Sequence, residues 1–177
     1  MIIKAEDVLS YPEFAGLTAV ELQQKLDALE LLIRKHTNNN FQNRNIRFSA
    51  PSLTDKIMGY HPFLRVGDTI QISDSKVNDG LYVVSEINSA SRYIVPDSEL
   101  FAVNHNLVTK VEYPVDVRRG ILNLMRWEVE NRSKVGIKAE SLSRHSVTYY
   151  DQDRNNQVMG YPVSLLGFLD IYKKARF

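Results

Sequence analysis

The sequence predicts an α+β protein: a small helical bundle of about four helices, with an inserted antiparallel β module and a short hairpin before the last helix. Three observations support this prediction. Apolar residues recur every three or four positions near both ends of the 177-residue chain, apolar and polar residues alternate in its middle, and turn-forming residues separate the two patterns. We therefore expect residues 1–45 and 114–177 to form a helical core, and residues 46–113 to form the inserted β module.

The first helical stretch is expected to contain a short helix at residues 5–10 and a long one after it. The long helix begins at Thr18, which forms the pattern of a capping box with Glu21. The threonine hydroxyl can accept from the third amide while the glutamate reaches back to the cap. At helical spacing the apolar residues share one face: Leu22, Leu26, Leu29 and Ile33. The asparagines at positions 38–40 end the pattern, because their side chains compete with the helix backbone.

The middle of the chain has the period of two that is typical of strands. The alternation predicts strands near residues 46–48, 69–72, 81–84, 92–95 and 107–113. Between the second and third of these, Val77–Gly80 supplies residues that accept a positive φ, so we expect a tight reversal there. A sheet of three or more strands can bury one face, whereas a lone hairpin is marginal in water.

Helical spacing returns after Pro114 and predicts a helix over residues 117–130. Residues 146–150 resemble a strand of a hairpin. The last helix is expected to begin near Pro162 or Ser164. Its apolar face contains Leu165, Phe168, Leu169 and Tyr172, and the cations Lys173, Lys174 and Arg176 follow at its carbonyl end.

The composition excludes several kinds of site. The chain has no cysteine, which removes disulfides, thiolate metal sites and cysteine nucleophiles. The four histidines lack the spacing that aims two imidazoles at one metal, and no glycine-rich loop leads from a strand into a helix to hold a nucleotide phosphate. We therefore expect no catalytic residue, metal or cofactor. We also expect a cytosolic protein without membrane contact, since no stretch approaches ~18 consecutive apolar residues.

The charges and the aromatic residues bear on binding. A net charge of +1 lacks the strong basic excess that usually accompanies sequence-specific DNA binding. The β module is acidic by two charges and the last third of the chain is basic by four, so the two could offer complementary faces. The nine tyrosines, seven phenylalanines and one tryptophan either fill the core or cover interfaces, and the sequence leaves both interpretations open.

Three segments of the last third carry a family resemblance. They are the helix Val117–Glu130, the segment Lys138–Tyr149, and Tyr161-Pro162 leading into Leu165–Tyr172. Together with the short and long helices that end before Phe41, they resemble the phage head-tail connector family, also called adaptor or head-completion proteins. The matching pieces cover a little over half of the chain. Two departures from the family pattern concern a local hairpin and the β module. Ser143 and Arg144 replace the usual glycine and acidic residue, His145 replaces a common aromatic residue, and the β module is longer than in minimal members.

The resemblance implies a structural protein and not an enzyme. Such a protein forms a ring, with twelve subunits as the expected number, under the portal vertex of a DNA-filled capsid. The ring extends the DNA channel, lets DNA pass without sequence-specific binding, and provides the docking surface for the next neck or tail component. Its expected location is the neck of the virion, and the host cytoplasm during assembly.

The resemblance also implies a role for the C-terminal helix in binding the portal protein. The expected portal-binding residues are Leu165, Phe168, Leu169, Tyr172, Lys173, Lys174 and Arg176. An apolar stripe with cations at its tip suits a groove bordered by acidic groups. Two alternatives stay open. One is another neck or tail component, such as a stopper or a tail terminator, and the other is an enzyme whose site combines residues far apart in sequence.

Overall fold

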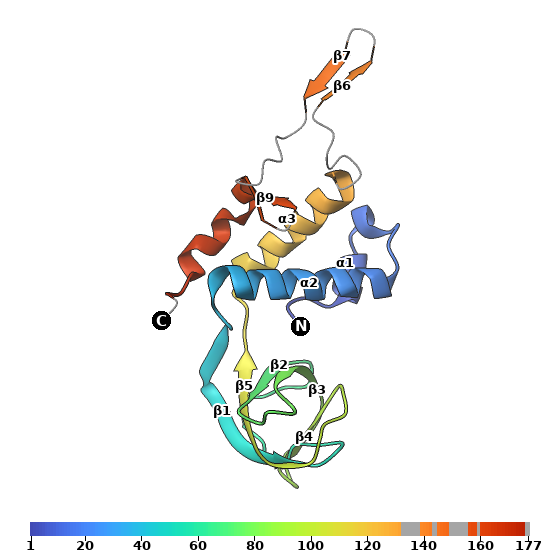
Figure 1. Ribbon diagram of the computed structural model, residues 1–177. Coiled ribbons are helices and arrows are strands. Elements are labelled where there is room, and N and C mark those ends of the chain that lie inside the picture. The colour runs from blue at the N-terminus through green and yellow to red at the C-terminus, as the bar shows by residue number, and fades with distance from the viewer. Residues whose placement is uncertain (132–138, 143–144, 149–155, 159, 176–177) are drawn as a thin grey trace. The chain divides into compact units, whose positions relative to one another are not determined.

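The protein combines helices with a five-stranded antiparallel sheet, which confirms the mixed α and β content that the sequence predicts. The computed structural model describes residues 1–131, 139–142, 145–148, 156–158 and 160–175 (Figure 1). The chain divides into two compact units. The β unit contains Met1–Ile2 and Asn40–Tyr113, and the helical unit contains Ile3–Asn39 and Pro114–Phe177.

The helical unit begins with the short helix α1 (Ala5–Leu9), the 3-10 turn η1 (Pro12–Phe14) and the long helix α2 (Ala19–Thr37). The predicted capping box is confirmed. Thr18 Oγ1 accepts a hydrogen bond from the Glu21 amide at 3.2 Å, and Glu21 Oε2 accepts one from the Thr18 amide at 3.1 Å. The predicted apolar face of α2 is buried, and it consists of Leu22, Leu26, Leu29 and Ile33.

The second half of the helical unit contains α3 (Val115–Asn131) and the last helix η3 (Val163–Tyr172), which lie side by side (Figure 1). The last helix is a 3-10 helix, in which side chains three residues apart lie above one another. Leu166 and Leu169 have this spacing and are both buried. The periodicity of an α-helix predicted Leu169 in the apolar face but not Leu166.

Among the described residues between α3 and η3 in sequence, there are two short antiparallel pairs of strands. Strands β6 (Ala139–Leu142) and β7 (His145–Thr148) pair with each other. Strands β8 (Gln157–Val158) and β9 (Tyr161–Pro162) form the second pair, from which the chain continues directly into η3.

The β unit contains the five-stranded sheet. Its strands are β1 (Gln42–Ser52), β2 (Thr69–Ser73), β3 (Gly80–Asn88), β4 (Tyr93–Pro96) and β5 (Val103–Val111). The spatial order is β1-β5-β2-β3-β4, and every neighbouring pair is antiparallel. The last strand in sequence is therefore inserted between the first two. Strand β1 also begins four residues before the predicted position, because its first residues pair with the end of β5.

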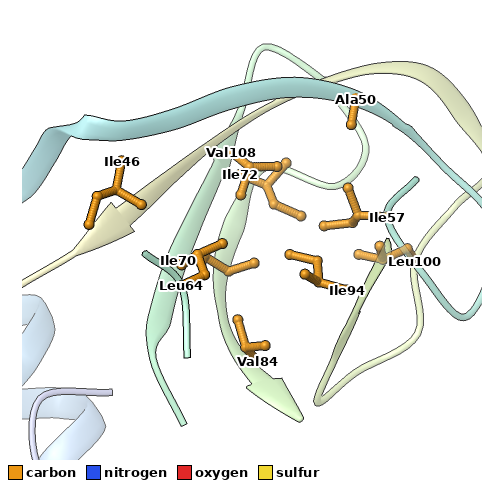
Figure 2. Packing of buried hydrophobic residues seen from close by; sticks show 10 residues of the cluster. All are labelled: Ile46, Ala50, Ile57, Leu64, Ile70, Ile72, Val84, Ile94, Leu100 and Val108. Carbon is orange, nitrogen blue, oxygen red and sulfur yellow. The ribbon is translucent and has the colours of Figure 1, made fainter. Parts of the chain in front are cut away.

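The core of the β unit lies on one face of this sheet (Figure 2). It contains Ile46, Ala50, Ile57, Leu64, Ile70, Ile72, Val84, Ile94, Leu100 and Val108. The long β1–β2 loop contributes Ile57, whose amide donates to the Ile94 carbonyl at 2.9 Å and whose carbonyl accepts from the Ile94 amide at 3.0 Å. These two bonds hold the loop against β4, so the loop covers apolar side chains that would otherwise face water.

The predicted tight reversal at Val77–Gly80 is wrong. The loop between β2 and β3 has six residues, 74–79, and the positive φ values occur at Asp74 (62°) and Lys76 (70°). The physical reason is the side chain of Asn78, which is buried and forms hydrogen bonds with neighbouring loops. A wider loop allows the chain to turn that amide inward.

Candidate functional site

The residues expected to bind the portal differ widely in exposure. Leu165, Phe168 and Tyr172 are half-buried, Lys173 and Lys174 are exposed, and Arg176 lies outside the described residues. Leu169 is 0% exposed and packs within the helical unit. Leu169 therefore stabilises its own unit and has no surface to offer a partner in this conformation.

Phe168 anchors the middle of η3 to α3. Its ring lies against Gly120, where a β-carbon would collide with three ring atoms. Gly120 is therefore the position of α3 that admits the aromatic side chain. The contact accounts for the burial of Gly120 in the middle of a helix, where glycine is otherwise unfavourable by about 0.5–1 kcal/mol relative to alanine.

Tyr172 anchors the end of η3 to the beginning of α3. Its hydroxyl donates to the carboxylate of Asp116, with 2.8 Å to each oxygen. This hydrogen bond to a carboxylate, followed by burial, raises the pKa of the Tyr172 hydroxyl above its ordinary value. Tyr172 is thus held by its own chain at its polar end.

The left-handed end of α2 holds the residues that follow η3. Asn38 has a φ of 50°, and its Nδ2 donates to the Ala175 carbonyl at 3.0 Å. Asn39 Nδ2 donates to the Tyr172 carbonyl at 3.1 Å, and the amide of Lys174 donates to the Thr37 carbonyl at 2.8 Å. These bonds satisfy backbone groups that the ends of both helices would otherwise leave to water.

Charges also meet at the end of η3. Lys173 Nζ lies 2.8 Å from Asp170 Oδ1, and the hydrogen bond and attraction of this cation lower the pKa of the Asp170 carboxyl. The pKa of His36 is lowered as well, chiefly by burial and then by the positive charge of Lys173. His36 therefore favours its neutral form in the folded state.

Two large apolar residues of η3 are exposed, and Ile171 near its C-terminal end is the more exposed one at 79%, against 45% for Val163 at its first position. We define the C-terminal surface as Ile171, Lys173 and Lys174, which are all exposed. The expected portal-binding set includes the two lysines and does not include Ile171. A signal was present in the sequence, since Ile171 is an apolar residue that lies off the apolar face of the last helix.

A second candidate site is a cavity of about 320 Å³ in the helical unit. It is lined by Glu21, Gln24, Lys25, Ala28, Leu29, Leu32, Glu128 and Tyr161. At its wall, Lys25 Nζ lies 2.5 Å from Glu128 Oε1, and the Tyr161 hydroxyl donates to the other oxygen of the same carboxylate. Lys25 compensates the charge of Glu128, and Tyr161 adds a hydrogen bond, so the three side chains connect α2, α3 and β9. Sequence reasoning did not single out this trio, because its members are 103 and 33 residues apart.

Metal sites and membrane-spanning helices are two further classes to consider within the described residues. No group of three histidine, aspartate or glutamate side chains is placed there to hold a metal ion. No helix in that part of the chain is long and apolar enough to span a bilayer. Comparison of the sequence with models of protein families and with curated proteins finds no match.

Proposed function

We propose that the protein is a structural component of a phage neck, a head-tail connector that forms a ring under the portal vertex. The ring extends the DNA channel and gives the next neck or tail component its docking surface. In this proposal the helical unit supplies the bundle-like core with its hairpin, and the β unit is an insertion into that core. The subunit works without a catalytic residue or cofactor, lets DNA pass without sequence-specific binding, and is assembled in the host cytoplasm into a neck of twelve copies.

The observation that carries this proposal is the exposure of the C-terminal surface beside a firmly anchored helix. Ile171 projects into solvent although Phe168 and Tyr172 fix the same helix to α3. An exposed apolar side chain on an element that is already ordered loses little conformational entropy when it docks on a partner. Lys173 and Lys174 beside it favour a partner groove with acidic borders.

The test is co-purification of the chain with purified portal protein. We expect the wild-type chain to bind, and Ile171→Asp to weaken binding at least about tenfold, as a hot-spot residue would. The matched control is Val20→Asp, since Val20 is also exposed but lies in the first turn of α2, where an acidic residue suits the helix dipole. Equal loss of binding in both variants would remove the C-terminal surface from the proposal.

Point variants test this surface better than a deletion of residues 165–177. Leu166 and Leu169 are buried in the helical unit, so the deletion would also expose the apolar residues that they cover. A loss of binding after the deletion would then report unfolding as well as a lost contact. Circular dichroism of Ile171→Asp and Val20→Asp should match that of the wild type, since both positions are exposed.

The same assay separates the alternatives. A stopper or tail terminator would bind purified connector or tail-tube protein and leave the portal unbound. An enzyme would be indicated by a nucleotide or metal that copurifies with the chain. We expect neither result, and either one would overturn the connector proposal.

A further inference from the structure

A buried polar network holds three loops together at one end of the β unit. The Nδ2 of Asn78 lies 3.1 Å from Ser52 Oγ, 3.1 Å from Asn106 Oδ1 and 2.9 Å from the Phe101 carbonyl. Its Oδ1 accepts from the Phe101 amide at 2.8 Å. Ser52 ends β1, Asn78 lies in the β2–β3 loop and Phe101 precedes β5, so one side chain fixes three segments distant in sequence. A network of this kind makes the backbone of the loops rigid.

Large apolar side chains project into solvent from these fixed loops. Phe101 is 68% exposed although both its backbone groups bond to Asn78. Leu53 follows Ser52 in sequence, Val77 precedes Asn78, and both are exposed. We define the apolar tip as Leu53, Val77 and Phe101. Because its backbone is already ordered, the tip loses little entropy when it binds a partner.

The loops that carry the apolar tip have a net negative charge. The tip loops comprise residues 53–58, 74–79 and 97–102, and together they contain five acidic residues and two basic ones, a net charge of −3. Two of the acidic side chains, Asp74 and Glu99, are exposed and form no ion pair among the described residues. The register places the tip beside the first residues of β5, where Ser52 pairs with Val103. These features favour a partner surface that is apolar and basic.

The helical unit carries a surface of that chemistry on α3. Val115 is 72% exposed, and Arg118 and Arg119 follow at three and four residues, so all three share one face of the helix. Both arginines are exposed, and within the described part of the chain neither guanidinium forms an ion pair. We define the arginine face as Val115, Arg118 and Arg119. Guanidinium groups pair with carboxylates and also stack on aromatic rings.

We propose that the apolar tip of one chain docks on the arginine face of a second copy. Phe101 packs against Val115 and stacks on the planes of the guanidinium groups. The acidic side chains of the tip loops pair with the positive charge of the same guanidinium groups. The contact joins two different surfaces, so each bound copy leaves one tip and one arginine face unoccupied, and further copies add until a ring closes. This inference rests on the proposed function, and it assigns the contact between neighbouring subunits of the ring.

The first test is self-association of the purified full chain by sedimentation velocity over a range of concentrations. We expect association that weakens at least about tenfold in Phe101→Asp and in the double variant Arg118→Glu/Arg119→Glu. The matched control for the tip is Phe63→Asp, an exposed phenylalanine of the β unit outside the tip. For the arginine face it is Arg44→Glu/Arg92→Glu, which makes the same change of net charge at exposed residues of the β unit.

The second test mixes the two association-deficient variants. Phe101→Asp keeps an intact arginine face, and Arg118→Glu/Arg119→Glu keeps an intact tip, so the mixture contains one functional pair of surfaces. At a concentration where either variant alone is monomeric, we expect the mixture to form a complex of one copy of each variant and nothing larger. No heterodimer in the mixture would overturn the inference, because a contact between different surfaces must be restored by mixing.

Two other outcomes would also overturn it. One is a wild-type chain that stays monomeric up to about 1 mM, and the other is equal weakening in the control variants. Neither outcome bears on portal binding, which involves the C-terminal surface and is measured with the portal present. Conversely, if the chain self-associates as expected but does not bind the portal, the result would support this contact and contradict the connector role.

Discussion

The ring of Phe168 occupies the space that a β-carbon at residue 120 would need, so the docking of η3 on α3 depends on Gly120. Both residues belong to the helical unit and are separated by 48 positions in sequence. The contact converts a residue that weakens an isolated helix into one that stabilises the folded unit.

We predict that Gly120→Ala destabilises the helical unit by about 1–3 kcal/mol, because the added methyl group overpacks the contact with Phe168. Gly167→Ala is the matched control, since a β-carbon there meets open space in the neighbouring helix. It should leave stability unchanged or raise it slightly. Urea unfolding of the two variants measures the difference, and equal stability would show that Phe168 moves aside without cost.

Lys25 and Glu128 give a second prediction. Lys25→Met should lower the free energy of unfolding by about 1–3 kcal/mol, because it removes the cation beside a carboxylate whose side chain is 8% exposed. The loss should be smaller in a chain that already carries Glu128→Gln, since a neutral amide needs no counter-charge. A double-mutant cycle of urea unfolding measures this coupling. Lys35→Met, at an exposed position of the same helix, serves as the control, and an additive cycle would contradict the coupling.

Asn78 gives a third prediction, on the β unit. Asn78→Ala should destabilise this unit by about 1–3 kcal/mol, because it removes the hydrogen bonds that Asn78 forms with buried partners such as Asn106. Asn104→Ala removes an exposed amide from β5 and should change stability by less than about 0.5 kcal/mol. Thermal unfolding followed by circular dichroism compares the two, and similar melting temperatures would argue against a structural role for the network.

The pH dependence of stability should report on His36. Burial and Lys173 lower its pKa in the folded chain, so the unfolded chain binds the proton more readily. The contribution of neutral His36 to the free energy of unfolding is therefore fully present above the unfolded pKa of about 6.5. This contribution is lost as the pH falls from there toward the lower pKa of the folded state.

Melting temperatures between about pH 5 and 8 test this expectation. His36→Gln should remove the loss that begins near pH 6.5, whereas His105→Gln, which changes an exposed imidazole in the β unit, should retain it. Stabilisation of the wild type as the pH falls through this window would reverse the sign and reject the assignment to His36.

Local sequence patterns predicted the helices and strands of this protein, but they did not predict which strands pair with one another. The capping box at Thr18 and the apolar face of α2 follow from contacts three and four residues apart, so a sequence contains them in full. The alternation of apolar and polar residues located the five strands, but it indicates only which side chains share a face of the sheet. It does not indicate that β5 pairs with both β1 and β2, because those pairings join residues up to 69 positions apart.

The candidate site divides in the same way. The amphipathic character of the last helix, its lysines and the connector resemblance came from the sequence. The tertiary structure decided that Leu169 is enclosed, that Ile171 is exposed and that Gly120 receives Phe168. The resemblance of the last third to phage connectors stays a prediction that the portal experiment tests.

The amino-acid sequence by itself determined approximately where helices and strands form, because capping and periodicity act within a few residues. Only the tertiary structure decided which apolar side chains become core and which remain as surface, since that depends on long-range packing. Phe168 and Phe101 show the difference: one packs against Gly120 of α3, and the other is left in solvent by loops that a buried asparagine holds in place.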